Sequence, residues 1–315
     1  MNVSAAPEAV PPLRLRRLRW LALFVCILSC LVVTISAYLR LSGAGLGCAD
    51  WPACYGRILT GVPSAPWQGA RMAHRIVATL MLLAGMLLVW RCWRPQPLRQ
   101  AGRYATLLLA LMLLLSAVGA FSANPRLAVV NLINLLGGLG LVTLSWRVVM
   151  ALKSARPVAQ RGTARLTDLA GLSLTLTVLL GGLIGARYAA PACGTLPDCQ
   201  GIWWPEAGWS ALLPFVTLTG PAGPGDAGGV TLHALHRYAA VLSTALLAVA
   251  ALRLRAAPWA RNAALAALAL LLLEGVIGVL TVASGFSLWL AVAHNLGAAL
   301  LLAAVASLTY YSAGQ

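Results

Sequence analysis

Long apolar stretches separated by short polar connections dominate the pattern of the chain. Each stretch approaches the roughly 20 residues that an α-helix needs to cross about 30 Å of hydrocarbon. The pattern therefore predicts an all-α membrane protein with eight transmembrane helices, embedded in a lipid bilayer. The predicted spans are residues 20–39, 72–90, 104–121, 127–146, 167–187, 231–252, 262–283 and 288–309.

Composition agrees with this interpretation, because 60% of the residues are hydrophobic and only 10% are charged. A soluble domain has about 25% charged residues. The formal net charge of +16 would suit a nucleic-acid partner only if the basic residues gathered on one face with polar residues between them. They lie instead between the apolar stretches, so we expect no nucleic-acid partner.

The basic residues cluster before the first span and after the second, fourth and sixth. By the positive-inside rule these segments are cytoplasmic, which predicts a bacterial-type inner-membrane protein with both termini in the cytoplasm. A basic segment before an apolar stretch also begins a signal peptide. We favour a retained first helix, because no clear cleavage pattern follows it. The clusters are Arg14, Arg16, Arg17 and Arg19; Arg91, Arg94, Arg99 and Arg103; Arg147, Lys153, Arg156, Arg161 and Arg165; and Arg253, Arg255 and Arg261.

Several segments of the first half of the chain recur in the second half. They are MAHRIVATL at 72–80 with ALHRYAAVL at 234–242, and NLLGGLGL at 134–141 with HNLGAALL at 294–301. Self-similarity at a near-constant offset indicates a duplicated unit. We therefore expect two tandem four-helix bundles, residues 1–165 and 166–315. Because each unit has an even number of spans, a pseudo-two-fold axis along the membrane normal would relate them.

Two cysteine pairs with the same spacing fall in connections predicted to face outward. They are Cys48 with Cys54 and Cys193 with Cys199. An oxidising compartment allows each pair to close a small disulfide, although sequence alone leaves unlinked thiols open. The other three cysteines lie in or beside predicted helices and are interpreted as small apolar residues. These are Cys26, Cys30 and Cys92.

All four histidines lie inside or at the edge of predicted spans: His74, His233, His236 and His294. Polar side chains at such positions are functional hypotheses by default. Imidazoles from two helices of a bundle can hold a heme iron from both faces. Because no C-x-x-C-H motif occurs and zinc needs more ligands, a non-covalent b-type heme fits best. The alternative is that these histidines serve only as interhelical hydrogen-bonding groups.

Three charged residues near these histidines also carry hypotheses. Arg75 and Arg237 each follow a histidine at the head of a span, where a guanidinium can pair bidentately with a heme propionate. The alternative is an interfacial arginine that reaches toward water. Glu274 is the only acidic residue deep in a predicted span. For it we favour a protonated, structural carboxyl.

Four segments carry a resemblance to a known family: AYLRLSGAGLGCADWPACYG at 37–56, CGTLPDCQGIWWP at 193–205, LHALHRYAA at 232–240 and AVAHNLGAALLL at 291–302. With them the sequence resembles the heme A synthase family, whose members oxidise a methyl group of heme O to the formyl group of heme A. The resemblance covers nearly the whole chain. It implies an oxidoreductase of cytochrome oxidase biogenesis, with a heme O-supplying enzyme and oxidase assembly factors as partners; we also allow for a homo-oligomer.

The resemblance also implies roles for single residues. Family members use two histidines from the second and fourth helices of each half, so His236 and His294 would hold a heme b. In the first half, His74 would contact the substrate heme. The position of its partner is Asn134, and the family's glutamate, three residues before His74, is replaced by Arg71.

Both exchanges act against the family's reaction. Asparagine is not a normal heme ligand, and arginine cannot accept a proton as a carboxylate can. We therefore expect a heme A synthase-like protein that makes little or no heme A. The alternative is a non-catalytic protein that binds heme b for oxidase assembly or electron transfer. A transporter, suggested only by the duplication, ranks last because no matching pair of Gly- or Pro-broken helices occurs.

Overall fold

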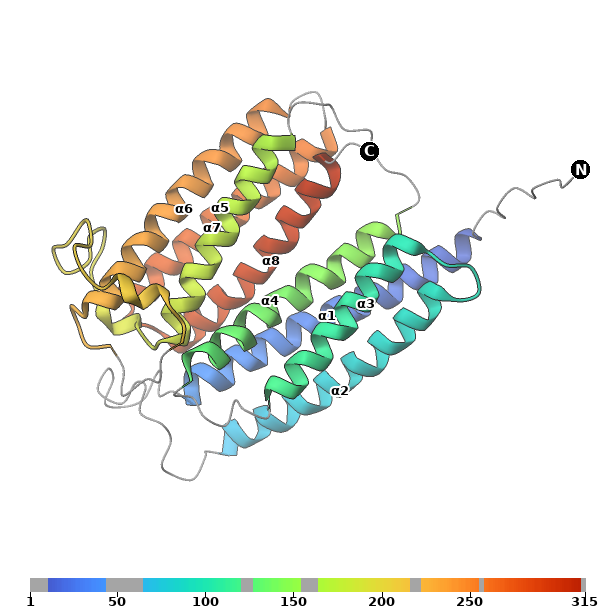
Figure 1. Cartoon of the computed structure of the whole chain (residues 1–315), viewed down its shortest axis with the longest axis horizontal. Helices are drawn as coiled ribbons and strands as arrows, with labels where there is room; N and C mark the ends of the chain where they lie inside the picture. Colours follow the sequence, from blue (N-terminus) through green and yellow to red (C-terminus); the bar gives the residue numbers. More distant parts are fainter. Residues whose placement is uncertain are drawn as a thin grey trace, which may run out of the picture.

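The computed structural model describes residues 11–43, 65–119, 127–153, 164–215, 222–254 and 258–312. In this part of the chain eight helices are long and apolar enough to cross a membrane, which confirms the all-α membrane fold (Figure 1). They are α1 (Pro12–Gly43), α2 (Ala65–Trp93), α3 (Arg99–Gly119), α4 (Ala128–Ala151), α5 (Ala164–Ala186), α6 (Ala227–Arg253), α7 (Pro258–Ala283) and α8 (Leu288–Ser312). Two short 3-10 helices, η2 (Ala190–Ala192) and η3 (Trp209–Leu212), lie between α5 and α6.

Most helices extend beyond the apolar stretches that predict them. Helix α1 begins at Pro12, where a proline is tolerated because the first N–H groups of a helix have no intrahelical partner. Helix α6 begins after Asp226, whose carboxylate accepts a hydrogen bond of 2.8 Å from the backbone N–H of Gly229. Such a cap satisfies one of these amide groups. The apolar pattern therefore locates the membrane part of each helix, whereas local capping sets its end.

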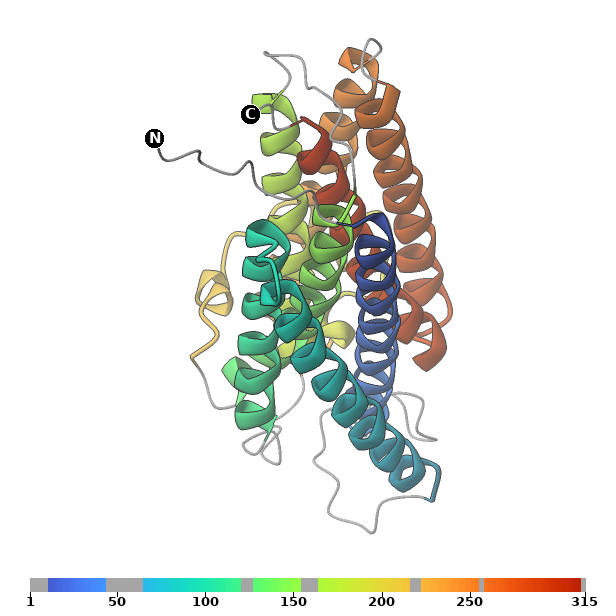
Figure 2. The same ribbon diagram turned by 90° about the vertical axis from the view of Figure 1, so that its right-hand side faces the viewer.

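The eight helices form two groups of four. In the first group, α1 and α3 each pack against α2 and α4; in the second, α5 and α7 each pack against α6 and α8. Figure 2 shows the α1–α4 group nearer the viewer and the α5–α8 group behind it. Each group has its own apolar core. The exact division of the chain at residue 165 and the two-fold relation between the groups stay predictions.

Fully buried apolar side chains fill the centre of each group. Close packing of this kind holds membrane helices together, because lipid tails are as apolar as the side chains themselves. In the first group they include Val25, Leu88, Leu108 and Val148. In the second group they include Leu174, Leu247, Ala264 and Leu308.

The two groups meet where α8 packs against α1 and α4, and where α4 packs against α5. Polar side chains join α4 to the last turns of α8. The indole N–H of Trp146 donates to Ser307, and Arg147 donates to Thr309, each at 2.6 Å. Near the other end of α8, Nη2 of Arg40 on α1 lies 3.4 Å from Oδ1 of Asn295. The first group therefore contributes a charged side chain to the second.

The first turn of α1 is fixed to the connection between α2 and α3. The Nη2 group of Arg14 donates to the backbone carbonyls of Arg91, Arg94 and Gln96 at 3.1, 2.9 and 2.7 Å. Two of the basic clusters thus lie at the same end of the molecule, as the predicted topology requires. The cytoplasmic orientation of this end stays a prediction.

Candidate functional site

A cavity of about 470 Å³ lies in the α5–α8 group, within the roughly 300–1,000 Å³ of typical ligand and cofactor pockets. Residues of all four helices line it, and side chains of α1 and α4 close one side. The walls are mostly apolar. The charged or titratable side chains among its lining residues are Arg40, His233, His236, Arg237, Glu274 and His294. Five of these six residues are sequence-predicted candidates, and the structure brings them to one cavity.

His236 lines the cavity from α6. Its Nδ1 lies 2.8 Å from the backbone carbonyl oxygen of Thr177 on α5. Because a carbonyl can only accept, Nδ1 carries the ring hydrogen and Nε2 keeps a lone pair. Gly181, one turn further along α5, leaves room for the ring, since a Cβ there would lie 3.0 Å from Cε1 of His236. The imidazole is therefore held with Nε2 as the atom able to bind a metal.

His294 lines the same cavity from α8. Its Nδ1 lies 2.7 Å from Oε2 of Glu274 on α7, a carboxyl group whose side chain is only 6% exposed. Gly278 on α7 faces the ring, and a Cβ there would lie 3.6 Å from Cε1 of His294. An oxygen atom thus lies on the Nδ1 side of both imidazoles, as is usual for histidines that bind metals through Nε2. The contact of His236 is a hydrogen bond, and that of His294 is a close approach of a carboxyl oxygen.

His233 has a different role. This side chain is buried, and its Nε2 lies 3.1 Å from the backbone carbonyl of Ala189, in the segment that follows α5. The contact joins the start of α6 to that segment. For this histidine the structure supports the hydrogen-bonding alternative, in which the imidazole satisfies a buried backbone group.

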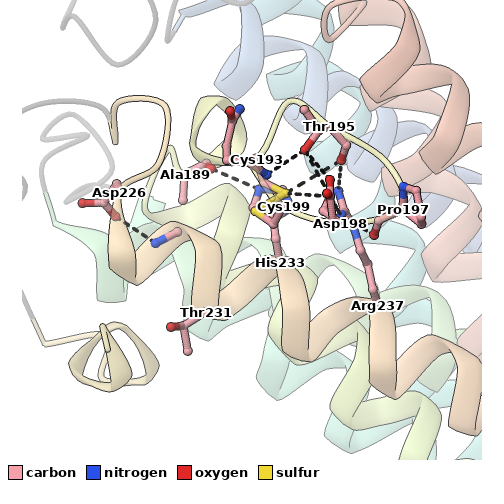
Figure 3. Close-up of a disulfide and its surroundings, with 12 residues drawn as sticks. Ala189, Cys193, Thr195, Pro197, Asp198, Cys199, Asp226, Thr231, His233 and Arg237 are labelled. Carbon is pink, nitrogen blue, oxygen red and sulfur yellow. Dashed lines mark hydrogen bonds between the residues drawn. A yellow bond between two sulfur atoms is a disulfide. The ribbon is translucent and has the colours of Figure 1, made fainter. Parts of the chain in front are cut away.

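Arg237 holds the loop between α5 and α6 (Figure 3). Its Nη1 donates to the carbonyl oxygens of Pro197 and Asp198 at 3.0 and 2.6 Å, and its Nη2 donates to that of Thr195 at 2.9 Å. Three carbonyl groups thus account for three of its five N–H donors. The loop side chain Leu196 also lines the cavity. Arg237 therefore fixes the wall of the cavity beside His236, and its contact with a heme propionate stays a prediction.

The same loop contains the Cys193–Cys199 disulfide, one of the two pairs expected from the sequence. Both cysteines are buried, and Figure 3 shows them beside the start of α6. The second pair, Cys48 and Cys54, lies outside the described residues. The disulfide closes the short loop whose carbonyl groups Arg237 binds.

Alkylation tests this disulfide directly. In protein purified without reductant and denatured, Cys193 and Cys199 should resist iodoacetamide and react only after reduction, because a disulfide has no free thiol. Peptide mass spectrometry gives the labelled fraction of each cysteine. Cys26, Cys30 and Cys92 are free thiols and serve as internal controls that react without reductant. Full labelling of Cys193 and Cys199 in the unreduced sample would contradict the pairing.

Arg40 is a site residue that the sequence reasoning missed. It lies near the end of α1, in the first group, yet it lines the cavity of the second group. A Cβ at Gly185 of α5 would lie 3.2 Å from Nη1 of Arg40. The guanidinium of Arg40 therefore lies against the last turn of α5. An arginine at the end of an apolar stretch is a signal that could have identified it, because ionisable residues within spans usually face an internal cavity.

The candidate residues of the first half lie on α2 and α4. His74 and Asn134 are half-buried, whereas Arg71 and Arg75 are exposed. The Cζ atom of Arg71 lies 5.5 Å from the centre of the Trp67 ring, a distance suited to a cation–π contact. These four residues are not among those lining the described cavity. Their part in binding or oxidising a substrate stays a prediction.

Comparison with known proteins identifies relatives over almost the full length. The sequence profile of the COX15-CtaA family, described as cytochrome oxidase assembly protein, matches residues 19–68 and 70–306. The chain is 31% identical to the heme A synthase of Shewanella oneidensis, over 94% of this chain and 96% of the relative. It is 28% identical to the heme A synthase of Erythrobacter litoralis, over 91% and 95% of the two chains. The matches include residues of all eight helices.

Proposed function

Because the chain belongs to the COX15-CtaA family of cytochrome oxidase assembly proteins, we propose that it is a heme A synthase-type membrane oxidoreductase. Its relatives carry the name heme A synthase, so the chain is an enzyme by resemblance. One observation carries the proposal for the second half: imidazoles of α6 and α8 line one cavity, and both have an oxygen at Nδ1. His236 and His294 would hold a heme b there through their Nε2 atoms. A bound heme of this kind supplies one-electron transfer.

The residues of the cavity fit a heme b. Two neutral imidazoles are the donor set of a low-spin cytochrome iron, and mostly apolar walls suit the porphyrin edges. Glycines stand next to both imidazoles, at Gly181 and Gly278, where larger side chains would crowd the rings. The helices thus provide two candidate ligands and a mostly apolar space between them.

The charged end of the cavity supports binding of the propionate groups. Arg40 and Arg237 both line the cavity beside the segment between α5 and α6. Guanidinium groups bind carboxylates in a planar, two-bond geometry. We assign Arg40 as the principal partner of a propionate, with the remaining N–H donors of Arg237 as a second. Arg75 would have the corresponding task for a substrate heme in the first half.

For the first half, the proposal is that α1–α4 receives heme O as substrate, with His74 as its protein ligand. Asn134 offers an amide where the family pattern has an imidazole, and Arg71 offers a positive charge where it has a carboxylate. Neither side chain can take up a proton during oxidation of the methyl group. We therefore propose that conversion of heme O to heme A is slow or absent in this chain.

The second candidate function follows from this contrast between the halves. The second half keeps both candidate ligands on one cavity, whereas Arg71 is exposed and lies against Trp67. A protein with only the second site would bind heme b and serve oxidase assembly or electron transfer without making heme A. In either case we place the protein in a bacterial-type inner membrane with cytoplasmic termini. A heme O-supplying enzyme, oxidase assembly factors and further copies of the chain are its proposed partners.

Extraction of hemes from purified protein tests the proposal. The chain is expressed in a host that makes heme O but lacks its own heme A synthase, and acid-extracted hemes are separated by chromatography. We expect heme b in near-equal proportion to protein, with at most traces of heme A or its hydroxylated intermediate. Heme b without either product would favour the second candidate function. Protein without any heme would contradict both.

A further inference from the structure

We infer that Glu274 is a positioning residue for His294, which it holds as the more basic of the two imidazoles that would bind the heme. The inference rests on the proposed function, in which His236 and His294 bind a heme b. Glu274 lies on α7, and Oε2 of its carboxyl group is 2.7 Å from Nδ1 of His294 on α8. Both residues of the pair line the cavity.

The position of one hydrogen atom decides what this contact does. If a protonated Glu274 donated to Nδ1, the ring hydrogen would lie on Nε2, and no lone pair would face the cavity. If the carboxylate accepts from Nδ1–H, Nε2 keeps its lone pair and can bind iron. Ligation by His294 therefore requires Glu274 to act as the acceptor. We infer an ionised acceptor here, whereas the sequence favours a protonated, structural carboxyl.

The helix hairpin provides a specific space for this carboxyl group. Gly297 lies on α8, about one turn beyond His294, and a Cβ at position 297 would overlap the Glu274 carboxyl group. A glycine in a helix interior is unfavourable by about 1 kcal/mol relative to alanine. At Gly297 the absence of a side chain leaves space on α8 that the carboxyl group of Glu274 occupies from α7. The glycine, the carboxylate and the imidazole thus form one arrangement on two adjacent helices.

The two candidate ligands differ in their acceptors. Nδ1 of His236 faces the neutral backbone carbonyl of Thr177, whereas Nδ1 of His294 faces the carboxyl group of Glu274, which we infer to be ionised. A hydrogen bond to an ionised group is roughly twice as strong as one between neutral groups. A carboxylate behind a ligating imidazole raises its basicity, and a more basic ligand favours iron(III). Glu274 should therefore hold the reduction potential of the heme below the value that two carbonyl-bonded imidazoles would give.

The test is the midpoint potential of heme b in purified, full-length Glu274→Gln protein. Glutamine keeps an oxygen acceptor for Nδ1–H but removes the negative charge. We expect heme content and the low-spin spectrum to be retained and the midpoint potential, measured by optical redox titration, to become more positive. Glu206→Gln is the matched control, because it removes the same charge from an exposed residue outside the membrane helices; its potential should equal that of the wild type.

Two further variants test the geometry. Glu274→Ala removes the acceptor and should weaken heme retention about 10- to 100-fold, the usual effect of losing an outer-shell partner. Gly297→Ala should displace the carboxylate and also raise the potential, but it should add little in the Glu274→Ala background, where no carboxylate remains. Equal potentials of heme-loaded Glu274→Gln and Glu206→Gln would overturn this inference and leave the ligand assignment intact. A wild-type protein without heme would overturn both.

Discussion

His236→Ala and His294→Ala are each expected to abolish the low-spin heme b spectrum of the purified protein. Each change removes one of two imidazoles that line the same cavity from facing helices. Loss of a direct iron ligand should reduce heme retention by more than the about 10- to 100-fold that follows loss of an outer-shell partner. Heme content per protein and the reduced-minus-oxidised absorption spectrum measure the effect.

His233→Ala is the matched control, because His233 is a buried imidazole on the same helix as His236. Its Nε2 lies within hydrogen-bonding distance of the backbone carbonyl of Ala189, so its removal should lower the stability of the protein but leave His236 and His294 in place. The low-spin spectrum should therefore persist in this variant. If His236→Ala and His294→Ala both kept the spectrum and heme content of the wild type, the ligand assignment would be wrong.

The apolar pattern predicts the membrane fold well because hydrocarbon thickness dictates helix length. Each of the eight predicted spans corresponds to one helix. The ends are less predictable, since they depend on local groups that no periodicity contains. Helix α2, for example, begins at Ala65, several residues before the predicted apolar stretch, and the start of α6 depends on the carboxylate of Asp226.

The candidate site was only partly predictable. His236 and His294 could be proposed because histidines are rare within membrane helices. The rotation of a helix that is apolar on all sides is not fixed by its sequence. The contact between Glu274 and His294 therefore required the packing of α7 against α8. The sequence indicates this contact only by placing Glu274 and His294 at similar distances from the turn between α7 and α8.

Arg40 and Arg237 show a second limit of sequence reasoning. Arg40 belongs by sequence to the first half, and only the packing of α1 against α8 brings it to the cavity of the second. The predicted propionate contact of Arg237 stays a prediction, and the sequence does not indicate that three backbone carbonyls of the loop at 195–198 bind its guanidinium. A charged side chain has many partners within reach, and the backbone path of a loop selects among them.

Arg71→Glu combined with Asn134→His is expected to increase heme A formation from a wild-type level near zero. The first change places a carboxylate three residues before His74, where it can accept a proton from the substrate region. The second supplies an imidazole on α4, able to bind iron where an amide cannot. A positioned general base contributes about 10²- to 10⁴-fold to a rate, so the double variant should exceed the wild type by at least 10-fold. Heme A yield in a host that makes heme O and lacks its own synthase measures the gain.

A matched control separates this gain from an effect of net charge. Arg99→Glu with Asn134→His makes the same change in charge, but Arg99 is exposed at the start of α3, at the opposite end of α2 from His74. This control should make no more heme A than Asn134→His alone. Adding His74→Ala to the active double variant should remove its activity, because the substrate heme would lose its first ligand. Abundant heme A from the wild type would show that Arg71 and Asn134 do not impair the first half. Equal yields from the double variant and its Arg99 control would show that position 71 is not where the reaction needs a base.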